Sequence, residues 1–351
     1  MTHSGAVRVL FRAAGGRGIG LGHVTRCSAL AQALVARGAE VRMFVRGDER
    51  AAALAGEKGI EAAVLPEAAA GELPTRLLHA WTPHVLVVDD YDVPSAVVAA
   101  SRDRAPTVVH AVLDDLGGRY VPADVLINGT PGAESFEYTT EAGCLRLLGA
   151  RFILLQPGFA AVPAREHREA IERVLITTGG ADIGCLAARA LHVVRRALGP
   201  VEAVVVRGPF ADAASEAALA AVWDEHLVRV EHSNDLRAAM LACDLAVSAA
   251  GQSLYELAAT ATPSVAVIVA ANQRANVRAL EREGTLVSAG EVDEAEVEDR
   301  IATLVARLAS DLQLRRAMGD AGRRAIDGRG AARVANALLE RVAEWQRRET
   351  A

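Results

Sequence analysis

The chain has 351 residues, a formal net charge of −6, a hydrophobic content of 51% and a mean hydropathy of +0.19. This length and apolar content can bury a large core, and they predict a globular protein of two domains. An aromatic content of 4% and the acidic charge offer little surface for counterion release or base stacking, so nucleic acid is not an expected partner.

No membrane span, metal site or secretory signal is expected. The longest apolar runs, such as residues 263–272, are shorter than the roughly 20 residues that a spanning helix needs. The N-terminal segment lacks a basic region followed by an apolar stretch and a cleavage site, so we expect a cytoplasmic protein. The four cysteines form no C-x-x-C pair, which argues against a zinc ribbon or a disulfide framework.

Lysine is almost missing from the chain: Lys58 is the one lysine among 38 basic residues. A phosphate-binding P-loop needs lysine after glycine, and a pyridoxal enzyme needs a lysine in a pocket. Lys58 lies in a polar segment and fits neither role, so these two classes of enzyme are not expected. We assign the chain no cofactor. Contacts to phosphate are then left to arginines, glycine loops and helix N-termini.

Short β-branched runs alternate with alanine-rich stretches along most of the chain, which predicts α/β domains with parallel sheets. Seven runs in the first half are predicted strands: 7–13, 41–46, 62–66, 84–90, 107–115, 124–129 and 151–155. Two prolines and a glycine then mark 156–170 as an interdomain linker. The second series of predicted strands is 173–180, 201–209, 227–232, 245–250, 264–270 and 285–290.

The chain ends in amphipathic helices, with Val334, Leu338, Val342 and Trp345 near helical spacing. We therefore predict two doubly wound Rossmann-like domains that face each other across a cleft. The N-terminal domain is expected at 1–157, the nucleotide-binding domain at 158–330 and a C-terminal amphipathic helix at 331–351. Ligands of such sheets bind beyond the carboxyl ends of the strands, so functional motifs should follow strands.

The first predicted strand is followed by a glycine-rich turn, "GGRGIGLGHVTRC" at 15–27. Its spacing, Gly18-x-Gly20-x-Gly22-His23, lacks the last glycine of a dinucleotide fingerprint. The second strand ends at Arg46, where an NAD enzyme would usually carry an acidic ribose ligand. NAD binding is therefore not expected, while NADP binding through Arg46 stays open. The helix after the turn has one apolar face, made of Val24, Cys27, Leu30, Ala31 and Leu34.

His23 lies at the N-terminus of that helix. The positive end of the helix dipole disfavours an imidazolium, so the ring should be neutral near pH 7 and able to accept a proton. His23 is thus a candidate general base. The alternative is that it only forms a hydrogen bond to a carbonyl of the loop.

Three motifs follow strands in the second half: "TTGGAD" at 177–182, "RGPF" at 207–210 and a long block at 248–273. In the long block a glycine turn precedes a helix, an arrangement that suits a diphosphate. Glu256, further along that helix, could accept hydrogen bonds from a ribose diol. The alternatives are that Glu256 is a solvated helix residue and that Asn272 and Gln273 are turn residues.

Five segments, in this order along the chain, carry a resemblance to a known family: "IGLGHVTRCSALAQAL", "VVDDY", "LGARFILLQPGF", "TTGGAD" and "AGQSLYELAATATPSVAVIVAANQ". In these segments the chain resembles the UDP-sugar hydrolases of the pseudaminic-acid pathway and the spore-coat polysaccharide biosynthesis proteins. It resembles the peptidoglycan N-acetylglucosaminyltransferase more distantly. The resemblance covers residues 7 to about 290 and implies the GT-B fold.

This resemblance implies an enzyme of surface polysaccharide or nonulosonic acid biosynthesis that hydrolyses a UDP-sugar to UDP and free sugar without a metal. His23 would be the base that activates water. Residues implied to bind the nucleotide are Gly179, Gly180, Asp182, Gly251, Gln252, Ser253, Glu256, Asn272 and Gln273. Those implied on the sugar and phosphate side are Gly20, Gly22, Arg26, Asp89 and Tyr91.

Two departures from the family's pattern leave alternatives open. Ala250 stands where the family usually has a first glycine, which puts a methyl group near the expected diphosphate, and Tyr255 stands where a tryptophan is frequent. Residues 113–132 are closer to the spore-coat branch, so the sugar, and a nucleotide other than UDP, stay open. The alternatives are a GT-B glycosyltransferase with a small-molecule or glycan acceptor and a non-catalytic nucleotide-sugar-binding protein. Residues 45–80 show no basic or apolar run typical of a membrane-facing surface, which favours water as the acceptor.

Overall fold

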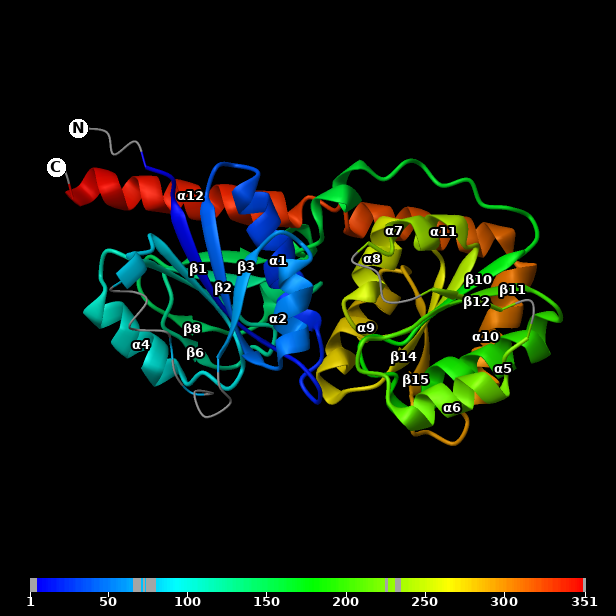
Figure 1. Ribbon diagram of the computed structural model, residues 1–351. Coiled ribbons are helices and arrows are strands. Elements are labelled where there is room, and N and C mark those ends of the chain that lie inside the picture. Colours follow the sequence, from blue (N-terminus) through cyan, green and yellow to red (C-terminus); the bar gives the residue numbers. More distant parts are fainter. Residues whose placement is uncertain are drawn as a thin grey trace. The chain divides into compact units, whose positions relative to one another are not determined.

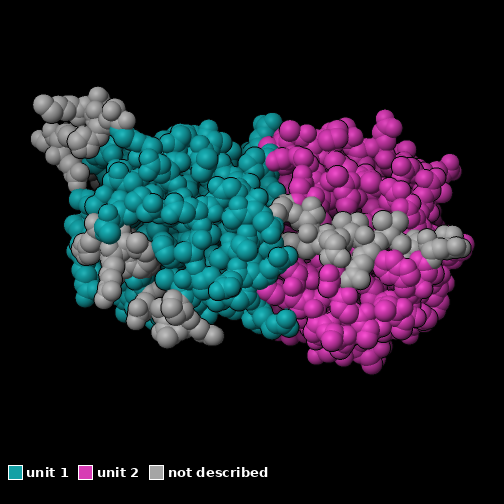
Figure 2. Space-filling view, viewed as in Figure 1, with its two compact units in different colours: residues 1–157, 328–351 teal, residues 158–327 magenta. Residues whose placement is uncertain are grey.

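The computed structural model describes residues 5–65, 71, 73, 80–224, 227–230 and 235–349. The chain forms two compact units, shown in different colours in Figure 2. Unit 1 contains residues 1–157 and 328–351, and unit 2 contains residues 158–327. Each unit has a parallel sheet with helices beside it, which confirms the predicted α/β class and the two Rossmann-like domains.

The sheet of unit 1 has seven strands in the order β3-β2-β1-β4-β5-β7-β9, and all its pairings are parallel (Figure 1). The strands are β1 (Arg8–Gly15), β2 (Glu40–Gly47), β3 (Glu61–Leu65), β4 (Val85–Asp89), β5 (Val109–Leu113), β7 (Val125–Asn128) and β9 (Leu145–Leu148). The helices are α1 (Gly22–Val35), α2 (Glu49–Gly56), α4 (Ser95–Arg104) and α12 (Gly330–Glu349). Short elements are β6 (Tyr120–Val121), β8 (Thr139–Thr140), and the 3-10 turns η2 (Ala133–Ser135) and η3 (Ala150–Phe152).

The predicted strand at 151–155 is wrong, because this stretch begins in η3 and continues without strand pairing. The edge strand is β9, a few residues earlier. Ile153 and Leu155 are nevertheless buried, and α12 begins against this stretch: a Cβ atom on Gly330 would lie 2.0 Å from the carbonyl oxygen of Ile153. An apolar run covered by a helix has the same composition as a buried strand, so the sequence pattern does not separate them.

Helix α12 returns the end of the chain to unit 1. Val334 and Leu338 are fully buried, and the helix packs along α1. The apolar face predicted for α1 is likewise buried. The packing of α12 on α1 and on η3 explains why residues distant in sequence form one unit.

The sheet of unit 2 has six parallel strands in the order β12-β11-β10-β13-β14-β15. The strands are β10 (Arg173–Thr177), β11 (Glu202–Val206), β12 (Leu227–Val230), β13 (Leu245–Ala249), β14 (Ser264–Ile268) and β15 (Val287–Glu291). The helices are α5 (Leu186–Leu198), α6 (Ala213–Ala221), α7 (Arg237–Ala242), α8 (Ser253–Ala259), α9 (Arg274–Arg282), α10 (Val297–Ser310) and α11 (Leu312–Ala325), with 3-10 turns η4 (Pro157–Ala161), η5 (Ile183–Cys185) and η6 (Ala271–Gln273). The predicted strands at 62–66 and 227–232, and the surface considered at 45–80, extend onto residues outside the described ranges.

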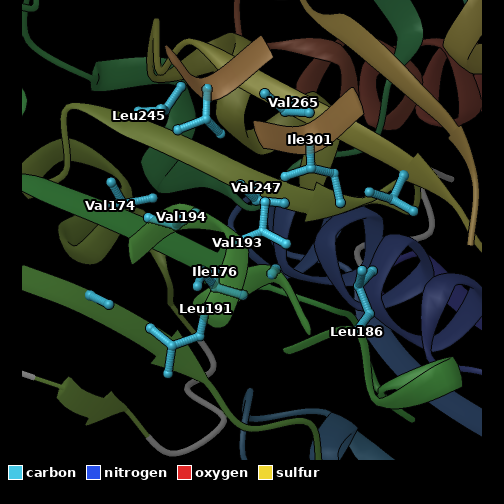
Figure 3. Packing of buried hydrophobic residues seen from close by; sticks show 14 of the residues in the cluster. Val174, Ile176, Leu186, Leu191, Val193, Val194, Leu245, Val247, Val265 and Ile301 are labelled. Atoms are coloured by element: carbon cyan, nitrogen blue, oxygen red, sulfur yellow. The ribbon is translucent and has the colours of Figure 1, made fainter. Parts of the chain in front are cut away.

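The core of unit 2 is built from strand and helix side chains that are almost completely buried. Figure 3 shows Val174 and Ile176 of β10 beside Val194 and Leu191 of α5, and Ile301 of α10 belongs to the same cluster. Burial of such β-branched and leucine side chains stabilises the fold by about 1.5–3 kcal/mol each. Within the described ranges, no helix has the length and apolar character needed to cross a membrane.

Three arginines attach residues 162–169 to the body of unit 2 through backbone carbonyl groups. Arg165 donates to the carbonyl oxygens of Met240, Cys243 and Thr260 and to the hydroxyl of Thr262. Arg315 donates to the carbonyl oxygens of Arg168, Glu169, Leu308 and Ala309, and Arg323 donates to those of Val162 and Pro163. Burial lowers the pKa of Arg165 to about 10, so it still carries its charge at neutral pH.

Replacing Arg315 by methionine tests this attachment. The side chain is 1% exposed, so Arg315→Met leaves buried carbonyl groups without donors, and we expect the free energy of unfolding to fall by about 3 kcal/mol. Arg316→Met, at an exposed position of the same helix, is the control and should change it by less than about 0.5 kcal/mol. Urea unfolding measures both, and equal effects would contradict the attachment.

Candidate functional site

The strand order of each sheet reverses at one place, and the predicted motifs lie there. In unit 1 the reversal is between β1 and β4, so the chain leaves these strands toward opposite sides. The glycine turn follows β1, and Asp89 ends β4. In unit 2 "TTGGAD" follows β10 and the glycine of the long block follows β13, which are the corresponding strands. Ligands of open α/β sheets bind at such reversals.

Two glycines near the first turn are required by close packing. A Cβ atom on Gly47, whose φ is +140°, would lie 1.7 Å from the carbonyl oxygen of Gly15. A Cβ atom on Gly15 would lie 2.5 Å from Val24 on α1. Glycine at these two positions therefore allows the end of β1 to pack closely against β2 and against the start of α1. Its N-cap residue, Leu21, supplies no side-chain hydrogen bond, and its first turn has no acidic residue, so within the described residues these positions do not cap the first N–H groups.

His23 is paired with a carboxylate. Its Nδ1 atom lies 2.7 Å from Oδ1 of Asp89, whose side chain is fully buried. Because a carboxylate only accepts hydrogen bonds, this contact requires a proton on Nδ1, and in the neutral ring Nε2 then carries the lone pair. Nε2 makes no hydrogen bond within the described part of the chain. The partner of His23 is thus a carboxylate and not the loop carbonyl of the alternative interpretation.

Arg26 and Tyr91 complete the surroundings of the imidazole. Arg26 forms a two-pronged contact with Asp89, Nε to Oδ2 at 2.7 Å and Nη2 to Oδ1 at 2.6 Å. The rings of His23 and Tyr91 meet edge to face with centroids 4.7 Å apart. Burial alone would raise the pKa of Asp89, but the charges of Arg26 and His23 and their hydrogen bonds outweigh it and hold that pKa well below its ordinary value. The carboxylate is therefore ionised at neutral pH.

The residue between Asp89 and Tyr91 fixes the backbone of the motif. Asp90 accepts from Arg12 at 2.7 Å and from two atoms of Arg46 at 2.8 Å. Successive residues at a strand end point to opposite sides, so anchoring Asp90 on one side presents Asp89 and Tyr91 on the other. Arg46 also contacts Asp92 at 2.5 Å. A 2′-phosphate at Arg46 would have to displace these carboxylates, which argues against NADP.

Asp115 belongs to this cluster and was not predicted. It lies in the loop after β5, accepts from Nη1 of Arg26 at 2.8 Å and accepts from the hydroxyl of Tyr91. A sequence signal did exist: both β4 and the neighbouring β5 are followed by paired aspartates, Asp89-Asp90 and Asp114-Asp115. In each pair one carboxylate holds its own loop and the other reaches the histidine cluster.

In unit 2 the "TTGGAD" loop begins α5. Asp182 has a left-handed backbone with φ +47°, and its Oδ1 accepts from the N–H of Ala187 at 2.9 Å. Burial raises the pKa of Asp182. The "RGPF" loop packs directly against this turn, because a Cβ atom on Gly208 would lie 2.3 Å from the carbonyl oxygen of Gly179. Phe210 donates its N–H to Gly180 at 2.8 Å. The nucleotide roles of Gly179, Gly180 and Asp182 remain predictions.

The predicted residues of the long block at 248–273 differ in how exposed their side chains are. Glu256 lies on α8 and is only 9% exposed, so the interpretation as a solvated glutamate is wrong. Ala250 is 2% exposed, and its methyl group is thus packed inside the unit. Asn272 is exposed in η6, whereas Oε1 of Gln273 accepts from the N–H of Val269 at 2.9 Å and stabilises the turn. Nucleotide contacts by these residues, and by Gly251, Gln252 and Ser253, remain predictions.

The structure therefore brings His23, Arg26, Asp89 and Tyr91 into direct contact in unit 1, beside Gly20 and Gly22 of the same turn. The predicted nucleotide residues follow β10, β13 and β14 at one edge of the other sheet. Among the described residues, no group of three or more His, Cys, Asp or Glu side chains is placed to hold a metal ion. An imidazole with an ionised carboxylate behind it and a basic Nε2 in front can remove a proton from a hydroxyl group or water.

Comparison with known proteins agrees with this architecture. No protein-family model matches the chain. It is 24% identical over 339 residues to the spore coat polysaccharide biosynthesis protein SpsG of Bacillus subtilis, covering 95% of this chain and 97% of SpsG. Among solved structures, MurG of Acinetobacter baumannii matches with a TM-score of 0.64 and 15% identity over 95% of this chain and 99% of MurG. UGT89C1 of Arabidopsis thaliana, solved with UDP, matches with a TM-score of 0.65 and 14% identity over 97% and 99%. The fold is that of GT-B glycosyltransferases, as the resemblance implied.

The low pKa of Asp89 predicts a pH-dependent contribution to stability. A carboxylate with a folded pKa below its unfolded value of about 3.9 stabilises the fold above that value and loses this effect as the pH falls. Asp89→Asn should therefore lower the free energy of unfolding by about 3–5 kcal/mol at pH 7, and by progressively less below about pH 4.

Asp103→Asn, at an exposed carboxylate on α4, is the matched control and should have little effect at either pH. Urea unfolding at several pH values measures the three proteins. A deficit of Asp89→Asn that stays constant with pH would show that the ion pair is not its cause.

Proposed function

We propose that the protein hydrolyses a UDP-sugar to UDP and free sugar, with His23 as the general base and the loops of unit 2 as the nucleotide site. The observation that carries the proposal is the pairing of His23 Nδ1 with the buried carboxylate of Asp89 at 2.7 Å. In the neutral ring this pairing leaves Nε2 free of a proton and able to accept one. His23 lies at the start of α1, whose N-cap residue, Leu21, makes no side-chain hydrogen bond to the first N–H groups.

In the proposed step, Nε2 of His23 takes a proton from water while the water oxygen bonds to the anomeric carbon. The bond from that carbon to the diphosphate oxygen breaks, and its electron pair leaves with UDP, so the configuration inverts. Asp89 keeps the Nδ1 proton in place and stabilises the imidazolium that forms. In this proposal water is the nucleophile, His23 accepts its proton, and the reaction as written uses no metal ion.

The nucleotide assignment is supported by the placement of the predicted nucleotide residues after β10, β13 and β14 at one sheet edge. Glu256 is a glutamate that unit 2 keeps mostly buried beside this edge, where it could accept hydrogen bonds from the ribose hydroxyls. A protein of the same fold, UGT89C1, has been solved with UDP. SpsG, by its name, acts in polysaccharide biosynthesis, and we propose that this chain does so as well, in the cytoplasm.

Glycosyl transfer is the second candidate. The same base would then remove the proton from an acceptor hydroxyl, and the shared fold with glycosyltransferases favours this reaction. A non-catalytic nucleotide-sugar-binding protein is a third candidate, and the intact pairing of His23 and Asp89 argues against it. Incubation with a panel of UDP-sugars and no acceptor separates hydrolysis from the other two: release of UDP and free sugar supports hydrolysis and identifies the sugar.

Nucleotide binding is tested by calorimetry. We expect saturable UDP binding to the wild type and a loss of affinity of about 10- to 100-fold in Glu256→Ala, the effect of losing a charge-assisted hydrogen bond. Glu283→Ala, at an exposed glutamate of the same unit, should bind as the wild type does. Millimolar UDP or UDP-sugars that leave the melting temperature unchanged would rule out the assignment.

The role of His23 is tested by separating turnover from binding. His23→Ala should lower kcat by about 10²- to 10⁴-fold and leave UDP affinity nearly unchanged, because the imidazole acts on water. If His23→Asn, which keeps hydrogen-bonding capacity, retains most activity and the same pH dependence, His23 is not the base.

A further inference from the structure

Two donors share one oxygen at the candidate base. Oδ1 of Asp89 lies 2.7 Å from Nδ1 of His23 and 2.6 Å from Nη2 of Arg26. The same Nη2 atom is only 3.1 Å from Nδ1. A small movement of the guanidinium along the carboxylate would therefore change the partner of Nη2 from Oδ1 of Asp89 to Nδ1 of His23.

This competition has a chemical consequence because a guanidinium carries donors only. In the observed position Arg26 and Nδ1–H both point at Asp89, and Nε2 carries the lone pair. A small shift of Nη2 toward the ring would make it a donor to Nδ1 instead. That contact stabilises the other neutral tautomer, in which Nε2 bears the proton and cannot act as a base.

Asp115 holds the guanidinium at its other end. Its Oδ2 accepts from Nη1 of Arg26 at 2.8 Å, and its Oδ1 accepts from the hydroxyl of Tyr91. Burial tends to raise the pKa of Asp115, but the charge of Arg26 and hydrogen bonds from Tyr91 and Arg26 lower it overall, so it is ionised at neutral pH. The planar guanidinium is thus fixed between carboxylates from the ends of two neighbouring strands.

We propose that Asp115 is a positioning residue that anchors Nη1 of Arg26 and thereby keeps His23 in the tautomer with the proton on Nδ1. The inference rests on the proposed role of His23 as a base for its catalytic meaning, although the tautomer itself is a property of the free protein. Asp115 acts through Arg26 and is not expected to touch the nucleotide.

The test reads the tautomer directly in the full chain. Nitrogen-15 labelled histidine gives ring signals from nine histidines, and His23 is assigned by the signal missing in His23→Gln. Above the pH of imidazole protonation, the wild type should show a single tautomer with Nδ1 protonated. Asp115→Ala should show both neutral tautomers, and Asp115→Asn, which keeps an acceptor but not the charge, should lie between them.

A double variant separates positioning from a general loss of structure. If Asp115 acts through Arg26, removing the competing donor in Asp115→Ala/Arg26→Met should restore the single Nδ1-protonated form. A folded Asp115→Ala or Asp115→Asn protein that keeps the wild-type tautomer would overturn the proposal, as would a double variant no different from Asp115→Ala. If Asp115→Ala does not fold, Asp115→Asn alone decides.

Kinetics then distinguish this inference from the proposed function. With an active UDP-sugar, Asp115→Ala should lower kcat by about 10-fold and leave KM within about twofold, as expected for a group behind the reacting residue. The control Asp103→Asn, at an exposed carboxylate of the same unit, should be unchanged. A wild type without turnover on any UDP-sugar would remove the proposed function, while the tautomer measurement would still decide the role of Asp115.

Discussion

Each sheet is parallel throughout, and its order reverses beside its first strand. Parallel strands need crossover connections, and at the reversal these connections leave toward opposite sides. The loops after two adjacent strands then separate, and their backbone N–H groups and side chains can meet a ligand. This single topological constraint places the glycine turn beside Asp89 in unit 1, and "TTGGAD" beside the long block in unit 2.

In unit 1 a buried carboxylate, that of Asp89, lies at the reversal of strand order. Placing a buried carboxylate there is unfavourable unless donors surround it, and Asp89 has Arg26, His23 and the thiol of Cys27, whose Sγ lies 3.3 Å away. Burial raises the pKa of Cys27, so the thiol remains protonated and serves as a donor. Removing any one of these donors therefore changes the hydrogen bonds that the others make. The position of His23 thus depends on its neighbours as well as on its own pairing with Asp89.

The sequence predicted the parts of this structure that depend on local pattern. Alternating β-branched and alanine-rich runs predicted the sheets, and helical spacing predicted the buried faces of α1 and α12. The resemblance directed attention to His23, Arg26, Asp89 and Tyr91, which the structure brings together. Their catalytic and binding roles remain predictions.

What the sequence did not predict depends on contacts between distant segments. Asp115 joins the cluster through Arg26, which is 89 residues earlier in the chain, and no local pattern encodes that reach. The burial of Glu256 depends on the packing of α8 in unit 2, which the helical pattern alone does not reveal. Residues 151–155 are buried against a helix from the end of the chain, so their composition indicated burial but not the partner.

The return of α12 to unit 1 has a consequence for how the protein is made. A ribosome releases the sheet of the first unit long before residues 328–351 exist, so α1 can pack on β1, β2 and α2 during translation but lacks its contact with α12. Unit 2 is continuous in sequence and is complete first, although its synthesis starts later. The first unit therefore begins first and is completed last, because its final helix, α12, is synthesised only after all of unit 2.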